Sequence, residues 1–182
     1  MNRPLITRSQ LLAKLSAKHG TAEQLPVIVG VRGYYKDDMG KKGANDRGIY
    51  DDAIFIVDQN NMFSYNANTD PSRFGMNSKI GKGLANLEAG KYLYKIGIHG
   101  LSKEKSKQYE ALVQQGKVEV KRDVTGQEEK GFFGINIHKG GFNTTSSEGC
   151  QTIHPSQWIE FITMAKAVFP NGKDIPYILI EN

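Results

Sequence analysis

The stretch from 131 to 154 reads GFFGINIHKGGFNTTSSEGCQTIH. Between 133 and 138, aromatic and β-branched residues alternate with Gly134, Asn136 and His138. A period of two is typical of a strand that buries one face and leaves the other free. The stretch therefore begins with a predicted strand, 131–138, whose free face carries Asn136 and His138.

Further strands are predicted where β-branched and aromatic residues cluster between turn residues. They cover 26–35, 53–58, 62–67, 91–98, 117–124 and 175–181. The polar residues 59–61 separate two of these runs and suit a hairpin turn. This pattern predicts a mainly β fold.

Helical spacing of apolar residues appears in two places. Leu11 and Leu15 predict an N-terminal helix over 9–19, and Pro155 suits the first position of a second helix over 155–169. The segment 101–116 fits either a short helix or a mobile insertion. We therefore expect two short helices beside the strands.

Two polar, glycine-rich segments, 36–52 and 66–90, are long for turns. Loops of this length in a compact domain are commonly functional, so we expect them to form the walls of a substrate cleft. No repeat or linker divides the chain. We expect one domain over 1–182, with a β-rich core at 26–152.

The composition excludes several classes of protein. Of the 182 residues 38% are hydrophobic, which is enough for a core. No apolar run approaches the roughly 18 residues of a membrane span. Residues 1–20 carry scattered basic residues and lack the apolar run of a secretory signal. We therefore expect a protein that is made in the cytoplasm and does not span a membrane.

The net charge of +5 fits an anionic partner, and a merely solvated basic surface is the alternative. The lysines are scattered and are not interleaved with aromatic residues, as a base-stacking surface would require. Nucleic acid is therefore not the expected partner.

The chain contains one cysteine, Cys150, so an internal disulfide is excluded. A lone cysteine is usually a small buried hydrophobic residue. Here Ser147, Glu148 and Gly149 precede it and Gln151 follows it, which makes a poor core environment. The sequence therefore favours a functional thiol, with the buried cysteine as the alternative.

The residues between His138 and Cys150 allow the chain to turn back on itself. Gly140 and Gly141 permit a sharp turn, which would place Gly149 and Cys150 beside the histidine. A thiol paired with an imidazole forms a thiolate, the nucleophile for an amide carbonyl. Backbone N–H groups around Gly149 and Cys150 would be donors to the oxyanion. The amino end of the helix at 155–169 would lower the pKa of the thiol.

Two other interpretations concern the same stretch. His154 precedes Pro155 and suits a helix cap, but it is also near enough in sequence to be an alternative base. A metal site formed by His138, Glu148, Cys150 and His154 lacks the paired spacings of known metal motifs. We expect neither a metal nor a cofactor.

A histidine at a strand end, a glycine-containing loop and then Ser-x-Gly-Cys resemble the active-site signature of the L,D-transpeptidase family. The resemblance assigns His138 as the base, Cys150 as the nucleophile, and Ser147 and Gly149 to the motif. It covers about residues 133–152. The family usually has a second histidine where this chain has Glu148, and a longer loop before the cysteine.

The resemblance implies a β-sandwich catalytic domain acting on peptidoglycan stem peptides by acyl-enzyme chemistry, as a transpeptidase or a carboxypeptidase. Relatives without a signal peptide resemble phage proteins or delivered effectors. Action at the periplasmic cell wall after delivery is therefore implied, with delivery machinery or an immunity protein as a further partner.

Several polar residues are candidates for binding the substrate. Arginines in polar segments can bind stem carboxylates with two hydrogen bonds, although a surface arginine is often only a solvated charge. The candidates are Arg32, Arg47, Tyr34, Asn136, Glu148 and Gln151.

Two other functions remain open. A catalytically inactive cell-wall-binding or phage structural module would explain Glu148 in the position of the family's histidine. A papain-type peptidase is disfavoured, because its cysteine precedes its histidine and opens a helix early in the domain.

Overall fold

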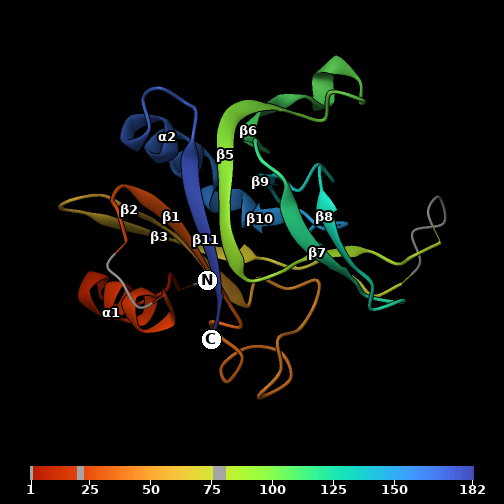
Figure 1. The fold of residues 1–182 in the computed structure, drawn as a ribbon, viewed down its shortest axis with the longest axis horizontal. Coiled ribbons are helices and arrows are strands. Elements are labelled where there is room, and N and C mark those ends of the chain that lie inside the picture. The colour runs from red at the N-terminus through yellow and green to blue at the C-terminus, as the bar shows by residue number, and fades with distance from the viewer. Residues whose placement is uncertain (1, 20–22, 76–80) are drawn as a thin grey trace.

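The structure, a computed structural model, describes residues 2–19, 23–75 and 81–182. Within these residues the fold is mainly β, as the sequence predicts. Eight strands form a closed barrel, and three more form a separate sheet (Figure 1).

The barrel combines antiparallel and parallel strand pairs. In their order around it, its strands are β1 (Val27–Arg32), β11 (Ile175–Glu181), β5 (Gly90–His99), β6 (Tyr109–Gln114), β9 (Ile137–Lys139), β10 (Gln151–Ile153), β3 (Met62–Asn68) and β2 (Asp52–Val57). The pairs β1–β11 and β9–β10 are parallel, and the other neighbours are antiparallel. The second sheet has the order β4 (Ala85–Leu87), β7 (Val118–Arg122), β8 (Glu128–Gly131).

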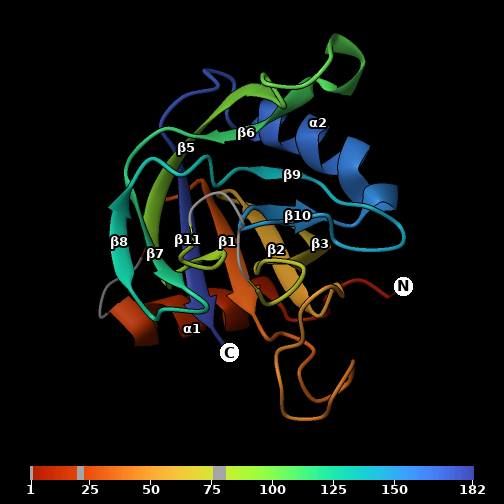
Figure 2. The same ribbon diagram turned by 90° about the vertical axis from the view of Figure 1, so that its right-hand side faces the viewer.

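The helices cover two different parts of the barrel (Figure 2). Helix α1 (Arg8–His19) packs Leu11 and Leu15 on the outer side chains of β1, β2 and β11. Because α1 covers that face, every residue of β1 and β2 is buried.

Helix α2 (Trp158–Val168) follows the 3-10 turn η2 (Pro155–Gln157) and packs on the barrel's interior cluster. The Phe161 ring meets the Tyr65 ring edge-on, with 5.2 Å between centroids. Full burial of such a side chain stabilises the fold by about 1.5–3 kcal/mol. The other 3-10 turn, η1, covers Lys105–Lys107.

Most elements predicted from the sequence are confirmed, with shifted ends. The strands predicted at 26–35, 53–58, 62–67, 91–98, 117–124 and 175–181 correspond to β1, β2, β3, β5, β7 and β11. The helices predicted at 9–19 and 155–169 correspond to α1 and to η2 with α2. Of the predicted loop 66–90, residues 76–80 lie outside the described residues.

The strand predicted at 131–138 is interrupted: β8 ends at Gly131 and β9 begins at Ile137. The Gln114 side chain replaces the missing strand partner, because its Oε1 accepts from the N–H of Phe133 and of Ile135, both at 3.1 Å. The left-handed φ of Gly134, +70°, bends the chain between them.

Four short strands, β4, β6, β8 and β10, do not appear among the predictions, since β8 overlaps the strand predicted at 131–138 only at Gly131. The undecided segment 101–116 contains η1 and all of β6. The specific sandwich is not confirmed, since the strands form a closed barrel with a side sheet. Neither α-helix, of 12 and 11 residues, is long enough to cross a membrane, and no other helix of the described residues is.

Candidate functional site

The parallel pair β9–β10 brings His138 and Cys150 to the same face. Gln151 pairs with Ile137 and Thr152 pairs with His138. Paired residues of neighbouring strands share a face, and faces alternate along a strand. Cys150, which precedes Gln151, therefore lies on the face that carries His138.

The turn that carries the thiol is fixed by hydrogen bonds from Ser147. Its Oγ donates to the Cys150 carbonyl at 2.6 Å and accepts from the Gly149 N–H at 3.0 Å. Its own N–H donates to Ser72 Oγ at 2.6 Å, and its carbonyl accepts from the Ser72 N–H at 2.8 Å. Ser147 therefore positions the turn and does not face a reacting atom.

Gly149 is required by both its conformation and its surroundings. Its φ is +149°, and a Cβ at this position would lie 2.6 Å from the Ala85 carbonyl oxygen. Side chains rarely tolerate this backbone region. The glycine before the cysteine therefore allows the turn to approach β4 closely.

The Cys150 thiol is half-buried in the wall of a cavity of about 390 Å³. Glu148 and Arg122 also line this cavity. The Asn136 N–H donates to Sγ at 3.4 Å, and Sγ donates to the Gly134 carbonyl at 3.3 Å. Burial raises the pKa of Cys150 to about 11, although the Asn136 N–H opposes this rise.

The His138 ring is buried and holds one proton at a defined nitrogen. Nδ1 lies 2.8 Å from the Lys139 carbonyl oxygen. A carbonyl only accepts, so Nδ1 carries the hydrogen and Nε2 has a free lone pair in the neutral ring. Burial, aided by the neighbouring His99, lowers the pKa of His138 to about 3.

His99 is a site residue that the sequence reasoning missed. Its ring stacks on the His138 ring, with 4.1 Å between centroids and 21° between planes. Asn136 Nδ2 donates to His99 Nδ1 at 3.2 Å, while Asn136 Oδ1 accepts from the Gln114 N–H at 3.0 Å. The sequence contained a signal for it, because 96–99 and 135–138 both read Ile-x-Ile-His and a glycine follows each within two residues.

The predicted thiolate–imidazolium pair is not the resting state of this site. The raised pKa of Cys150 and the lowered pKa of His138 keep both groups neutral at pH 7. The expected lowering of the thiol pKa is wrong, because desolvation by burial outweighs the lowering by the Asn136 N–H and by the charge of Lys103. Within the described residues His138 and Cys150 form no hydrogen bond with each other.

The expectation for the oxyanion donors changes in one respect. The Gly149 N–H is occupied by Ser147 Oγ, so it is not free to bind a substrate oxygen. The Cys150 N–H makes no hydrogen bond within the described part of the chain. It is the donor that remains available beside the thiol.

Four predicted substrate-binding residues lie away from the thiol face. Gln151 points into the barrel, where it accepts from the Tyr177 hydroxyl at 3.2 Å. Its direction follows from the alternation of β10, because it is the neighbour of the outward-facing Cys150. The Tyr34 hydroxyl accepts from the N–H groups of Leu5 and Ile6, both at 3.0 Å.

The two predicted arginines are occupied by internal partners. Arg32 is only 5% exposed and forms ion pairs of 3.0 Å with both Asp70 and Glu181. Arg47 pairs with buried Asp123 at 2.7 Å. These contacts hold loops in place and leave neither guanidinium facing the thiol.

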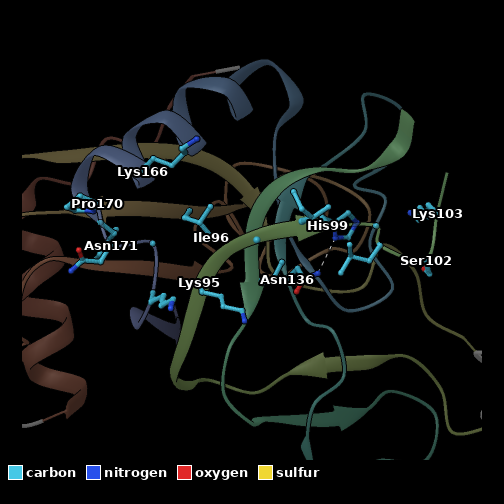
Figure 3. A pocket seen from close by; sticks show the side chains of 17 residues that line it. Lys95, Ile96, His99, Ser102, Lys103, Asn136, Lys166, Pro170 and Asn171 are labelled. Atoms are coloured by element: carbon cyan, nitrogen blue, oxygen red, sulfur yellow. Dashed lines mark hydrogen bonds between the residues drawn. The ribbon is translucent and has the colours of Figure 1, made fainter. Parts of the chain in front are cut away.

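The other polar candidates lie at or near the thiol. Asn136 lines a second cavity, of about 1040 Å³, together with His99 (Figure 3). Glu148 is exposed at the first cavity. His154, the alternative base, caps η2 as expected, with Nδ1 accepting from the Ser156 N–H at 3.3 Å.

Among the described residues, no group of three or more His, Cys, Asp or Glu side chains is arranged to hold a metal ion. Comparison of the chain with protein-family models, with curated proteins and with solved structures gives no match. The functional conclusion therefore depends on the residues and their geometry.

Proposed function

We propose that the protein is a cysteine acyltransferase of the L,D-transpeptidase type that acts on peptidoglycan stem peptides. The main support is that the single cysteine lies on a glycine turn at a cavity wall, directly before the strand that pairs with the strand of His138. We include in the proposal that the barrel with its side sheet is a closed variant of that family's sandwich.

The proposed reaction has two steps. Cys150 Sγ attacks the carbonyl carbon of the L-centre that precedes a D-residue, and His138 Nε2 takes the thiol proton. The Cys150 N–H binds the oxyanion. The C–N bond then breaks, and the proton on His138 passes to the leaving amine. An amine of another stem or a water molecule then attacks the thioester and releases the thiol.

The neutral resting state fits a general-base mechanism. Proton transfer from thiol to imidazole must accompany attack, because both ions are disfavoured by burial before the substrate arrives. The Lys139 carbonyl, 2.8 Å from Nδ1, would stabilise the transient imidazolium. The proposal places this reaction at the periplasmic cell wall, reached by phage-dependent or secretion-dependent delivery.

A second candidate is a catalytically inactive cell-wall-binding or phage structural module. It is favoured by Glu148, whose charge adds to the burial that raises the pKa of Cys150. Under this candidate the cavity binds a stem peptide without forming a thioester.

The deciding experiment is mass spectrometry of a disaccharide-tetrapeptide after incubation with the protein. We expect loss of the terminal D-residue, its exchange for a free D-amino acid, or stem dimers. Cys150→Ala should abolish these products, and Thr163→Ala, on the exposed side of α2, should leave them unchanged. Binding without products in any buffer would favour the inactive module.

A compartment test examines the proposed site of action. Expression in the bacterial cytosol should be tolerated, and fusion to a cleavable export signal should cause rounding or lysis. Cys150→Ala should remove this harm. Undiminished periplasmic toxicity of Cys150→Ala would reject the cysteine mechanism.

A further inference from the structure

The second cavity, of about 1040 Å³, opens along β5 and carries positive charge at several points (Figure 3). Lys95, Lys103, Lys166 and Lys173 line it, together with His99 and Asn136. No Asp or Glu of the described residues lines it. We call this cavity the lysine cleft.

Most of this charge is not neutralised by the protein. Lys166 pairs with Glu110 at 2.8 Å. Lys95, Lys103 and Lys173 are exposed and form no ion pair with any described residue. Like charges gathered in a concave surface focus the field and attract an anionic ligand.

The backbone that carries the lysines is fixed at both ends of the cleft. The Ile96 N–H donates to the Gly172 carbonyl at 2.8 Å, which ties the turn before Lys173 to β5. At the other end the Lys103 N–H donates to the Gly100 carbonyl at 2.7 Å, and the Lys103 carbonyl accepts from Gln108 Nε2 at 2.9 Å. The backbone positions from which Lys103 and Lys173 project at the two ends of the cleft are therefore fixed.

The lysine cleft lies next to the thiol site at two residues, although the cleft and the cavity at Cys150 share no described lining residue. Asn136 lines the cleft, and its N–H donates to Cys150 Sγ at 3.4 Å. His99 also lines it and stacks on His138. Burial lowers the pKa of both histidines, and the charge of Lys103 adds to the lowering, so Lys103 is within electrostatic reach of the site.

We propose that the lysine cleft binds the free carboxylates of the peptide that Cys150 attacks, and that the protein therefore prefers carboxylated stems to amidated ones. This inference rests on the proposed function, since it identifies the substrate by the charge of its side groups. Lysines suit separate carboxylates, because each ammonium is a point charge on a flexible stem.

Nucleic acid is the other polyanion that a basic cleft attracts, and the lining disfavours it. Among the described lining residues, Phe169 is the only Phe, Tyr or Trp, and its side chain is buried, with 8% of the residue exposed. Binding of single strands uses exposed aromatic platforms for the bases. The cleft offers charge without such a platform.

The test is calorimetric binding to the Cys150→Ala protein, which cannot turn over the ligand. The probes are a stem tetrapeptide with free carboxylates and the same peptide with these groups amidated. We expect the free acid to bind about tenfold or more tightly than the amide, since each exposed ion pair contributes up to about a fivefold gain in affinity. The triple variant Lys95→Gln/Lys103→Gln/Lys173→Gln should lose this preference.

A control variant removes one charge outside the cleft. Lys42→Gln, in the exposed segment after β1, should keep the preference. Replacement of the three cleft lysines by arginine should keep most of the preference for the free acid. This variant keeps the charge, so it shows whether the loss in the glutamine variant comes from charge or from misfolding.

The outcomes distinguish the inference from the function on which it rests. Equal binding of both peptides, or no binding, would overturn the lysine cleft, and so would tighter binding of a thymidine decanucleotide than of the free acid. Products formed in the mass-spectrometric assay would leave the proposed function standing in each case. Lysine-dependent binding without any Cys150-dependent product would support the cleft and reject the acyltransferase.

Discussion

Arg32 and Cys150 both lie among buried polar groups at strand ends. The two clusters differ in how many hydrogen-bonding groups keep no close protein partner. In the first, which we call the arginine cluster, Arg32 contacts Thr69 and Asp70, and Asp52 accepts from the Thr69 N–H at 2.6 Å. In the thiol site, Sγ has two contacts longer than 3.2 Å and faces a cavity.

The arginine cluster contributes more to the stability of the fold than the thiol site does. The guanidinium of Arg32 donates to partners on several segments, including the Leu87 carbonyl at 2.9 Å. A buried charge with this many partners fixes loops to one another. His138 Nε2 has no hydrogen-bond partner among the described residues, and the Cys150 thiol has only two long contacts, so both groups are available for chemistry.

The largest expected effect is on the arginine cluster. Arg32→Met should reduce the free energy of unfolding by about 3–5 kcal/mol, because it leaves Asp70 buried without its cation. Urea unfolding at pH 7 measures it. The control Arg3→Met breaks a 2.5 Å pair with Glu160 whose side chains are 40% and 45% exposed, so it should cost less than about 1 kcal/mol. Equal losses of stability in Arg32→Met and Arg3→Met would mean that the buried ion pairs of Arg32 contribute no more than an exposed one.

The next effect is the acid sensitivity of the thiol site. The folded-state pKa of His138, about 3, lies below the unfolded value of 6.5, so the unfolded state binds more protons between these values. The stability from this group is therefore present above pH 6.5 and is lost as the pH falls towards 3. On the order of 3 kcal/mol should disappear between pH 6.5 and pH 4.

The variant His138→Gln should show a flatter decline over the same window. Thermal unfolding at a series of pH values compares the two proteins. An identical slope in both would mean that the imidazole titrates normally and is not desolvated.

A smaller effect is expected at the glycine before the cysteine. Gly149→Ala should cost about 1–3 kcal/mol, because φ is +149° and the Ala85 oxygen occupies the space of the Cβ. Gly126→Ala is the matched control, since φ is +68° and nothing lies within 4 Å. Chemical denaturation of both variants isolates the contact with Ala85. A cost no greater at 149 than at 126 would contradict the close approach to β4.

The smallest effect on stability is expected for the thiol itself. Cys150→Ala removes a half-buried group with two weak contacts, so the free energy of unfolding should change by less than about 1 kcal/mol. Phe161→Ala, at a fully buried residue of α2, should cost about 3–5 kcal/mol in the same assay. A large loss for Cys150→Ala would assign the cysteine to the core.

The sequence predicted the long strands well because their apolar faces repeat over several residues. β10 and β4 have three residues each, too few for a period to be recognised. The segment 131–138 kept the alternating pattern but lacked a strand partner, since Gln114 occupies its N–H groups from a distant position. When a distant side chain takes the hydrogen bonds of a missing neighbouring strand, nothing in the local sequence indicates it.

The site was predictable where the residues are neighbours in sequence and less so elsewhere. The assignment of His138 and Cys150 to one face followed from alternation and a turn. The pKa directions did not, because burial depends on His99, Asn136 and the surrounding strands. Arg32 looked like a loop cation in the sequence, and only its position at the end of β1 shows its buried partners.

The pairing of β9 with β10 sets the distance between His138 and Cys150 in the fold. The number of residues between them along the chain does not set it. Three backbone pairs fix the two strands, whatever the chain between them does. Phe142 is 77% exposed, and the turn closes through the Gly141 N–H on the Thr144 carbonyl at 3.1 Å. The segment is therefore an insertion point, where extra residues after Phe142 would lengthen the loop without moving Cys150 relative to His138. Variation in that loop would reshape the cavity of about 440 Å³ beside Tyr50 and His154, while Cys150 and His138 stay in place.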